Sequence, residues 1–197
     1  MRRLLATALV ASLALVAPTQ AASLSGMGAM IFGDGFNFTR PNLAARPITS
    51  ITAGPLAIGL QQTRLSDVRR AFGGTMQSGG GATWLCYFAE GANSWFISNA
   101  AGGQEFVMMV AVEAATRPAA DCEANDSFAP LAFNVPGLGA GTAELRAQFG
   151  AASGNRIAYR HDRPGPYADV GQYLGYVLRS GRVTGIGLGE TSVPTAH

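Results

Sequence analysis

Few side chains in this sequence could take part in covalent or acid–base chemistry. Its 197 residues include two histidines, His161 and His197, and two cysteines, Cys86 and Cys122. Lysine is absent, because all 14 basic residues are arginine. Without lysine the chain has no P-loop, no Schiff-base nucleophile and no lysine general base.

His161 is the candidate for acid–base chemistry, at the expected end of a strand. It precedes Asp162 and lies between Arg160 and Arg163. A catalytic histidine needs a nucleophile or a second acid–base group within hydrogen-bond reach, and the sequence pairs no serine or cysteine with it. It also lacks a Gly-x-Ser-x-Gly elbow. We therefore interpret His161 as structural and predict that the protein is not an enzyme.

Two further patterns approach a cofactor or metal motif without meeting its requirements. In GLGAGTAEL, from Gly137, the third glycine of a dinucleotide-binding loop would fall on Thr142. Asp121, Glu123 and Asp126 place three carboxylates in six residues, but they lack the central glycine and terminal glutamate of a calcium loop. We interpret these patterns as a turn and a solvated acidic connector, and predict no cofactor and no metal.

The N-terminal residues have the pattern of a secretory signal peptide. Arg2 and Arg3 precede the apolar run 4–16, and small residues follow around Ala21 and Ala22, where cleavage is expected. The run is shorter than the roughly 20 residues of a membrane span. We predict a signal peptide at residues 1–21, a periplasmic or secreted location and no membrane anchor after cleavage. An uncleaved anchor is the alternative.

Charge and cysteine content fit that location. Removing Arg2 and Arg3 leaves 12 of the 14 arginines against 12 acidic residues. This balance argues against a nucleic-acid partner. In an oxidising compartment Cys86 and Cys122 are expected to form a disulfide, closing a loop of about 35 residues and contributing on the order of 3 kcal/mol. Two buried free thiols are the alternative.

A repeated pattern indicates the elements that position these residues. PLAIGLQQTRLSDVRRAFGG, from Pro55, and PLAFNVPGLGAGTAELRAQFGA, from Pro130, share a Pro-Leu-Ala start, a Gly-Leu step and a helical stripe that ends in Phe-Gly. Strand-like runs follow each helix, at 83–88, 94–98 and 105–112 and then at 156–161, 172–179 and 182–188. Chance similarity of short segments is the alternative.

The pattern predicts an α+β fold of two similar units, each a short helix packed on a three- to four-stranded antiparallel meander. The units cover residues 55–113 and 130–190, and the acidic connector 114–129 joins them. An irregular glycine-rich arm, residues 22–54, precedes them, and a tail, residues 191–197, follows. Both helices are too short to be stable alone, so each must pack on its meander.

The repeated unit resembles that of small bacterial envelope proteins: the SmpA/OmlA outer-membrane assembly lipoproteins, which are BamE-like, and the secreted β-lactamase inhibitor protein. The residues that carry the resemblance are Thr63, Val68, Arg69, Phe72, Gly73 and Tyr87, and then Thr142, Leu145, Arg146, Phe149, Gly150, Tyr159 and Gly181. Unlike the lipoproteins, the chain has no cysteine before Cys86, and prolines interrupt the region of their additional helix. The resemblance implies helices packed on a curved sheet and a protein-binding role.

Five residues form the candidate binding surface. Trp84, Phe88 and Trp95 make the first meander rich in aromatic side chains, and Arg156 and Arg160 alternate with apolar residues in the second. Burial in the core is the alternative for the aromatic residues, and an ordinary solvated face for the arginines.

The function that these observations predict is protein binding in the envelope or outside the cell. The protein would inhibit an envelope or extracellular hydrolase, or assist envelope assembly, with an envelope or secreted protein as its partner. The alternative is a periplasmic carrier of a small apolar ligand near Trp84 and Trp95. Three phenylalanines of the arm are available to dock on the body or on a partner: Phe32, Phe36 and Phe38.

Overall fold

Antiparallel strands from both halves of the chain form one large sheet in the computed structural model, which describes residues 22–195. The predicted signal peptide lies outside the described residues. The main strand order is β3-β4-β5-β6-β11-β10-β9, and the short β7 pairs with β4 in parallel. The strands are β3 (Gln77–Gly79), β4 (Ala82–Ala89), β5 (Ala92–Asn99), β6 (Met109–Ala114), β7 (Glu123–Ala124), β9 (Arg156–Arg163), β10 (Ala168–Arg179) and β11 (Arg182–Pro194).

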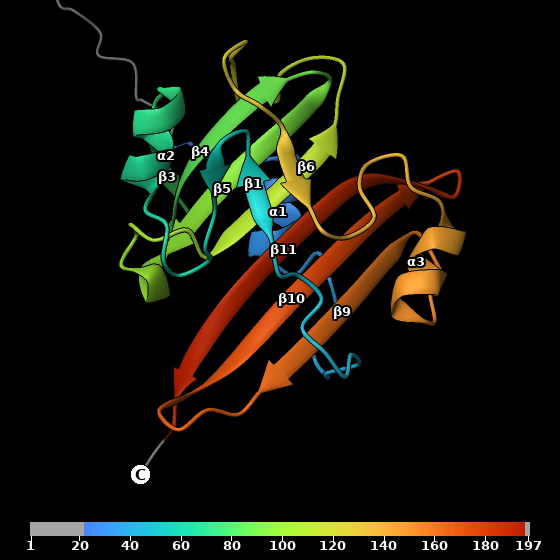
Figure 1. Ribbon diagram of the computed structural model, residues 1–197. Coiled ribbons are helices and arrows are strands. Elements are labelled where there is room, and N and C mark those ends of the chain that lie inside the picture. The colour runs from blue at the N-terminus through green and yellow to red at the C-terminus, as the bar shows by residue number, and fades with distance from the viewer. Residues whose placement is uncertain (1–21, 196–197) are drawn as a thin grey trace, which may run out of the picture.

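Two helices and a small sheet cover one face of the large sheet (Figure 1). The helices are α2 (Leu65–Phe72) and α3 (Thr142–Phe149), and the small sheet has the order β2-β1-β8, formed by Leu56–Ala57, Ile51–Ala53 and Leu131–Phe133. Leu65 and Val68 of α2 and Leu145 of α3 are fully buried in this layer. The α+β class is therefore confirmed.

In the first half of the large sheet α2 precedes the four antiparallel strands β3 to β6, and in the second half α3 precedes three, β9 to β11. The halves meet where β6 pairs with β11, from Met109–Glu113 against Gly185–Gly189. Their strands differ in length, because β10 and β11 have 12 and 13 residues and β4 and β5 have eight each. β11 runs to Pro194, into the stretch that the sequence analysis treats as a tail. The internal repeat itself stays a prediction.

The two short helices α2 and α3 are capped in the same way at their starts. Helix α2 begins at Leu65 after Arg64, and α3 begins at Thr142 after Gly141. Carboxylates of the first turns cap both helices, since Asp67 accepts from the Arg64 amide at 3.3 Å and Glu144 from the Gly141 amide at 2.6 Å. Among residues 22–195, no helix is both long and apolar enough to cross a membrane.

The opposite face of the sheet is covered by α1 (Gly26–Phe32), a helix within the arm that the sequence analysis treats as irregular (Figure 1). Met27 and Ile31 are buried there. A Cβ atom at Gly28 would lie 2.8 Å from the Trp95 ring, so glycine permits this close approach. Seven residues with two glycines have little intrinsic helix propensity. Docking on the sheet stabilises α1, and for that reason the local pattern did not predict it.

The chain then crosses from one face of the sheet to the other around the edge strand β9. Backbone amides of Asn42 and Leu43 donate to the Arg160 carbonyl at 2.9 and 3.0 Å, and the Asn42 side chain accepts from the Arg160 amide at 2.8 Å. Residues 42–48, named here the strap, therefore cap part of a strand edge that would otherwise be open.

Candidate binding site

The tryptophans predicted for a binding surface lie in the interior. Trp84 and Trp95 are fully buried on the sheet face that α1 covers, and the Trp95 indole donates to Asp121 at 3.0 Å. The prediction that they form a surface is wrong, because helix α1 covers this face of the sheet. The sequence of α1 has little helix propensity, so this cover was not predicted. Phe88, at the end of β4, is partly buried, and its carbonyl accepts from the Asn125 amide at 3.0 Å.

The acidic connector also has a structural role that its sequence did not indicate. Asp121 is 5% exposed and accepts from the Ser25 amide at 3.3 Å, from the Ser25 hydroxyl and from Trp95. Glu123 accepts from the Thr75 amide at 3.0 Å. Asp121 therefore holds the start of the arm against the sheet and is not part of a solvated linker. No group of three potential metal ligands occurs within residues 22–195.

The predicted disulfide is confirmed. Cys86 of β4 and Cys122 of the connector are bonded, with their Cα atoms 4.5 Å apart and 36 positions apart in the sequence. The bond ties the connector to the same sheet face on which Asp121 binds the arm. Two adjacent links, the disulfide and the hydrogen bonds of Asp121, therefore fix the layer that buries the tryptophans.

The predicted arginines do reach the surface. Arg156 and Arg160 of β9 line an open hollow of about 810 Å³ together with Phe38 and Tyr173. The remaining lining residues, from the arm and β9, are Asp34, Gly35, Phe36, Asn37, Thr39 and Ala158. This region, named the arginine hollow, is built from the arm on one side and strands β9 and β10 on the other.

Arg160 is held in place within the arginine hollow, whereas Arg156 is free to bind. Arg160 donates to Asp162 and to the Phe38 carbonyl, both at 2.7 Å, and its guanidinium lies 5.3 Å from the centre of the Tyr173 ring. The hydrogen bond to Asp162 raises the pKa of Arg160 above its ordinary value. Arg156 is exposed, and no ion pair is recorded for it in the described chain.

A smaller cavity lies on the other face of β9, beneath the strap. His161, Gln172 and Glu190 are neighbours across β9, β10 and β11, since Gln172 pairs with both of the others. The cavity has a volume of about 230 Å³, and its lining consists of Arg46, His161, Arg163, Val170, Gln172 and Glu190. This strap cavity puts His161 beside a carboxylate, but no serine, threonine or cysteine lines it.

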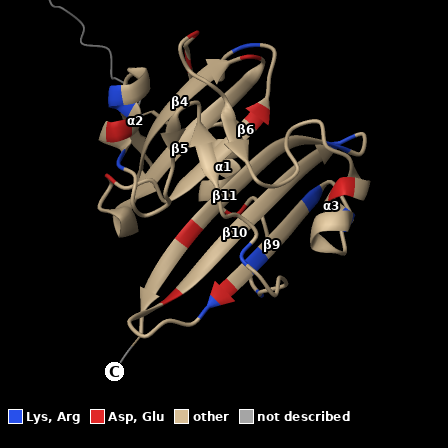
Figure 2. Cartoon of the chain, viewed as in Figure 1, with Lys and Arg blue, Asp and Glu red and all other residues tan. Residues whose placement is uncertain are grey.

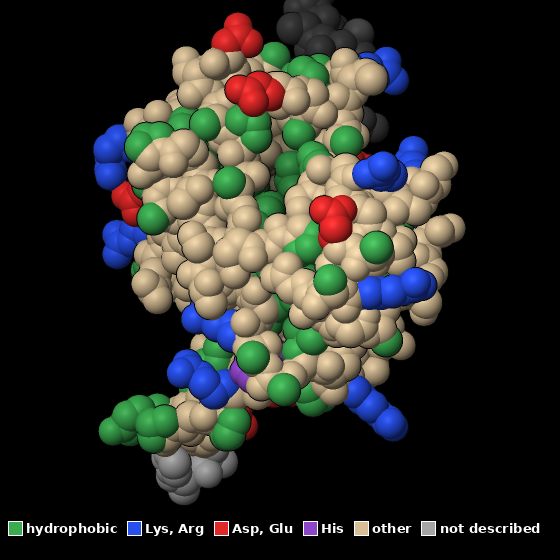
Figure 3. Space-filling model, turned by 45° about the vertical axis from the view of Figure 1, so that its right-hand side comes forward, with side chains coloured by type: hydrophobic (Ala, Val, Ile, Leu, Met, Phe, Trp, Pro, Cys, Tyr) green, Lys and Arg blue, Asp and Glu red, His purple; other side chains and the backbone are tan. Residues whose placement is uncertain are grey.

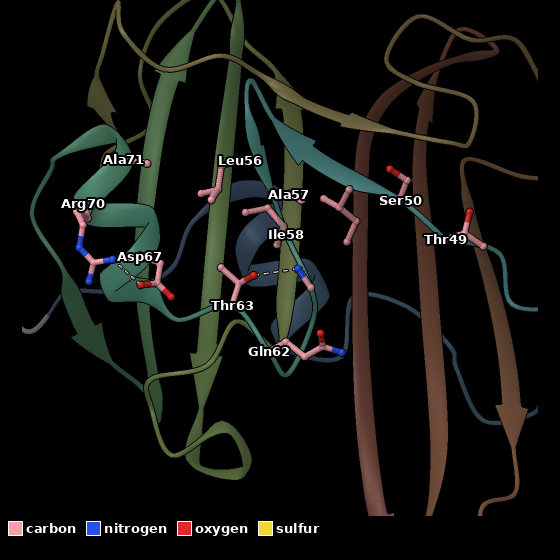
Figure 4. A pocket seen from close by; sticks show the side chains of 12 residues that line it. Thr49, Ser50, Leu56, Ala57, Ile58, Gln62, Thr63, Asp67, Arg70 and Ala71 are labelled. Carbon is pink, nitrogen blue, oxygen red and sulfur yellow. Dashed lines mark hydrogen bonds and ion pairs between the residues drawn. The ribbon is translucent and has the colours of Figure 1, made fainter.

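A third hollow, of about 890 Å³, lies between α2 and the β1–β2 hairpin (Figure 4). Its charged side chains pair with each other, since Arg70 binds Asp67 at 2.9 Å. The Thr63 hydroxyl accepts from the Gly59 amide at 2.9 Å, as the second dashed line in the figure marks. Because these polar groups already have partners, this hollow is a weaker candidate than the arginine hollow.

Comparisons with models of protein families, with curated proteins and with solved structures found no match. The resemblance to envelope repeat proteins therefore stays a prediction, and any function has to be argued from the sites themselves.

Proposed function

We propose that this protein is a non-catalytic binding protein that docks a protein partner in the arginine hollow. The observation that carries the proposal is the pairing of one fixed and one free arginine beside aromatic rings. Arg160 is fixed by three contacts, with Asp162, the Phe38 carbonyl and the Tyr173 ring, while Arg156 has its guanidinium available. Arginine and tyrosine are frequent among the residues that dominate binding energy at protein interfaces.

The chemistry of the hollow indicates an acidic partner segment. A carboxylate of the partner would meet Arg156 and an apolar side chain would meet Phe38 or Tyr173, both of which are partly exposed. Arg160 is already oriented, so its side chain loses little conformational entropy on binding. Such docking could serve to inhibit a hydrolase or to assist envelope assembly, and the sequence resemblance supports both roles.

The disulfide adds a location to the proposal. Disulfides persist in oxidising compartments, so the Cys86–Cys122 bond supports a periplasmic or extracellular setting. The alternative function, carriage of a small apolar ligand near Trp84 and Trp95, has less support. Those side chains are fully buried beneath α1, and a ligand there would have to displace that helix.

The test compares three forms of the protein as baits in an envelope extract: wild type, Arg156→Glu and the control Arg179→Glu. Arg179 is exposed at the end of β10 and does not line the arginine hollow. We expect one stoichiometric partner with wild type and with the control, and at least a tenfold weaker affinity of the isolated partner for Arg156→Glu, about 1.4 kcal/mol.

Two results would contradict the proposal. One is equal affinity of the isolated partner for wild type and for Arg156→Glu. The other is native mass spectrometry in which the wild-type protein carries a small apolar molecule and retains no protein at stoichiometric ratio. That second result would support the carrier function instead.

A further inference from the structure

Polar contacts hold the strap over the sheet, and three of them engage Glu190. This carboxylate, 8% exposed, accepts from Arg46 at 2.9 Å, from Gln61 at 3.1 Å and from Gln172 at 3.2 Å. The Gln172 side chain also accepts from the Ile48 amide at 2.9 Å. Since three donors share its two oxygens and Arg46 balances its charge, Glu190 forms a wall of the strap cavity and not a group left for a ligand.

Two other groups of the strap cavity, His161 and Arg163, line it beside Glu190. His161 Nδ1 lies 3.2 Å from the Leu43 carbonyl, which can only accept, so Nδ1 is the donor of this hydrogen bond and Nε2 of the neutral ring is an acceptor. The guanidinium of Arg163 is exposed, and no ion pair is recorded for it within the described residues. Figure 3 shows this part of the surface, where purple histidine lies beside blue arginine side chains.

The charges of the strap cavity define the ligand that fits. Arg46 and Arg163 contribute two positive charges and Glu190 one negative charge, so one positive charge is left over. One negative charge on a ligand balances it, whereas a dianion would be repelled by the buried Glu190. A guanidinium binds a carboxylate through two parallel hydrogen bonds.

The size of the strap cavity restricts the rest of the ligand. About 230 Å³ is below the roughly 300–1,000 Å³ of sites for drug-sized molecules. Val170 supplies an apolar wall for a short alkyl group. We propose that the strap cavity binds the carboxylate of a small monocarboxylic acid through the Arg163 guanidinium, with the His161 ring beside the bound acid as part of the cavity wall. This site is separate from the arginine hollow, because it lies on the opposite face of β9.

Proton NMR of His161 tests the site directly. His197→Gln leaves His161 as the single histidine of the chain, so its ring signals can be followed without overlap. With butyrate as the probe, we expect a saturable shift of the His161 ring signals. Arg163→Gln should weaken butyrate binding about tenfold, the usual effect of losing a charge-assisted contact. The control Arg179→Gln should leave it unchanged, and inorganic phosphate should bind more weakly than butyrate.

A second probe identifies the source of the carboxylate, which is either a free acid or the C-terminus of a peptide. Tighter binding of butyrate than of N-acetyl-alanyl-alanine assigns the site to a free acid, and the reverse order assigns it to a peptide terminus. Both orders support a carboxylate site.

The inference is overturned if butyrate causes no saturable shift up to about 50 mM, well above the millimolar range of weak specific sites. Equal butyrate affinity of wild type and Arg163→Gln would overturn it as well, provided that both proteins have the same thermal unfolding midpoint. Failure here is distinguishable from failure of the proposed function, because Arg156→Glu should not alter butyrate binding and Arg163→Gln should not alter retention of the protein partner.

Discussion

In both halves of the large sheet a short helix precedes antiparallel strands, but the surfaces of the two halves differ. In the first half, β4 and β5 contain no charged residue (Figure 2). Nearly all of their side chains are buried. In the second half, β9 exposes arginines on both of its faces, toward the arginine hollow and toward the strap cavity. The accessible arginines of these strands therefore belong to the second half, where the proposed binding site lies.

The difference arises from how the arm lies across the sheet. Helix α1 covers β5, β6 and β11, and the disulfide and Asp121 fix the layer there. Farther along, only a loop of the arm reaches β10, where a Cβ atom at Gly175 would lie 2.7 Å from the Phe36 ring. The loop leaves Arg156 uncovered. One segment thus buries the two tryptophans of the first half and shapes the hollow in the second.

The largest effect expected from this comparison is on Trp95. Trp95→Ala should lower the free energy of unfolding by about 4 kcal/mol, because it empties a fully buried site and leaves Asp121 without one of its donors. Urea unfolding measures the change. The matched control, Tyr167→Ala, alters a side chain that is 82% exposed and should cost under about 0.5 kcal/mol. Similar values for both variants would contradict the burial of Trp95.

The disulfide should contribute slightly less. The double variant Cys86→Ala, Cys122→Ala should lose about 3 kcal/mol, since the bond closes a long loop of the unfolded chain. Loss of the disulfide should also lower protection from hydrogen exchange more in the arm than in α3. Hydrogen exchange measured by mass spectrometry distinguishes these regions, and uniform loss of protection over both halves would argue against a local link.

Gly28 tests the close contact between α1 and the first half. Gly28→Ala should destabilise the protein by about 2 kcal/mol, because the new methyl group would overlap the Trp95 ring despite the better helix propensity of alanine. Gly137→Ala is the control, since nothing lies within 4 Å of a Cβ atom there. Thermal unfolding compares the two, and a stabilised Gly28→Ala variant would mean that α1 does not pack this tightly.

Alkaline pH should weaken both halves together. Burial raises the pKa of Tyr87 in the first half and of Tyr176 in the second above the ordinary value. The folded protein therefore holds these protons after the unfolded chain has released them. Stability is complete below about pH 10 and falls as pH rises further, by up to about 1.4 kcal/mol per pH unit for each group. Urea unfolding from pH 8 to pH 11 should show a smaller loss for either Tyr→Phe variant.

At neutral pH, replacing Tyr87 or Tyr176 by Phe should change the free energy of unfolding by different amounts. This difference is the smallest effect expected. The Tyr87 hydroxyl donates to the Gly73 carbonyl at 2.7 Å, whereas no hydrogen-bond partner is recorded for the buried Tyr176 hydroxyl in the described chain. Tyr87→Phe should therefore cost about 1 kcal/mol, and Tyr176→Phe should be neutral or slightly stabilising. Equal losses in urea unfolding would show that both hydroxyls have partners.

Local sequence patterns predict the longer strands of this fold well, whereas the short strands β1, β2, β3, β7 and β8 were not predicted. The predicted runs 83–88 and 94–98 lie within β4 and β5, and 156–161 and 182–188 within β9 and β11. The run 105–112 is less accurate, since β6 begins at Met109 after a one-turn helix and a turn. Strand prediction is reliable where side chains point alternately to the two faces of the sheet over several residues. It is less reliable where a loop is rich in apolar side chains.

The candidate site was predictable only in part. Arg156 and Arg160 reach the surface, because they lie on the edge strand β9 and point away from Ile157 and Tyr159, which face the core. The strap cavity was missed, although His161 and its arginine neighbours were noted. The signals for it were Gln172 and Glu190, two polar residues next to apolar stretches of β10 and β11.

The sequence by itself determined the α+β class, the disulfide pair and most strand positions, because these follow from alternation, helical spacing and cysteine content over short distances. The tertiary structure decided which surfaces are left open. Ser25 and Asp121 are 96 residues apart, His161 and Leu43 are 118 apart, and Arg46 and Glu190 are 144 apart. No local period encodes contacts at such separations, so the burial of Trp95 and the pocket beside His161 depended on where the arm packs.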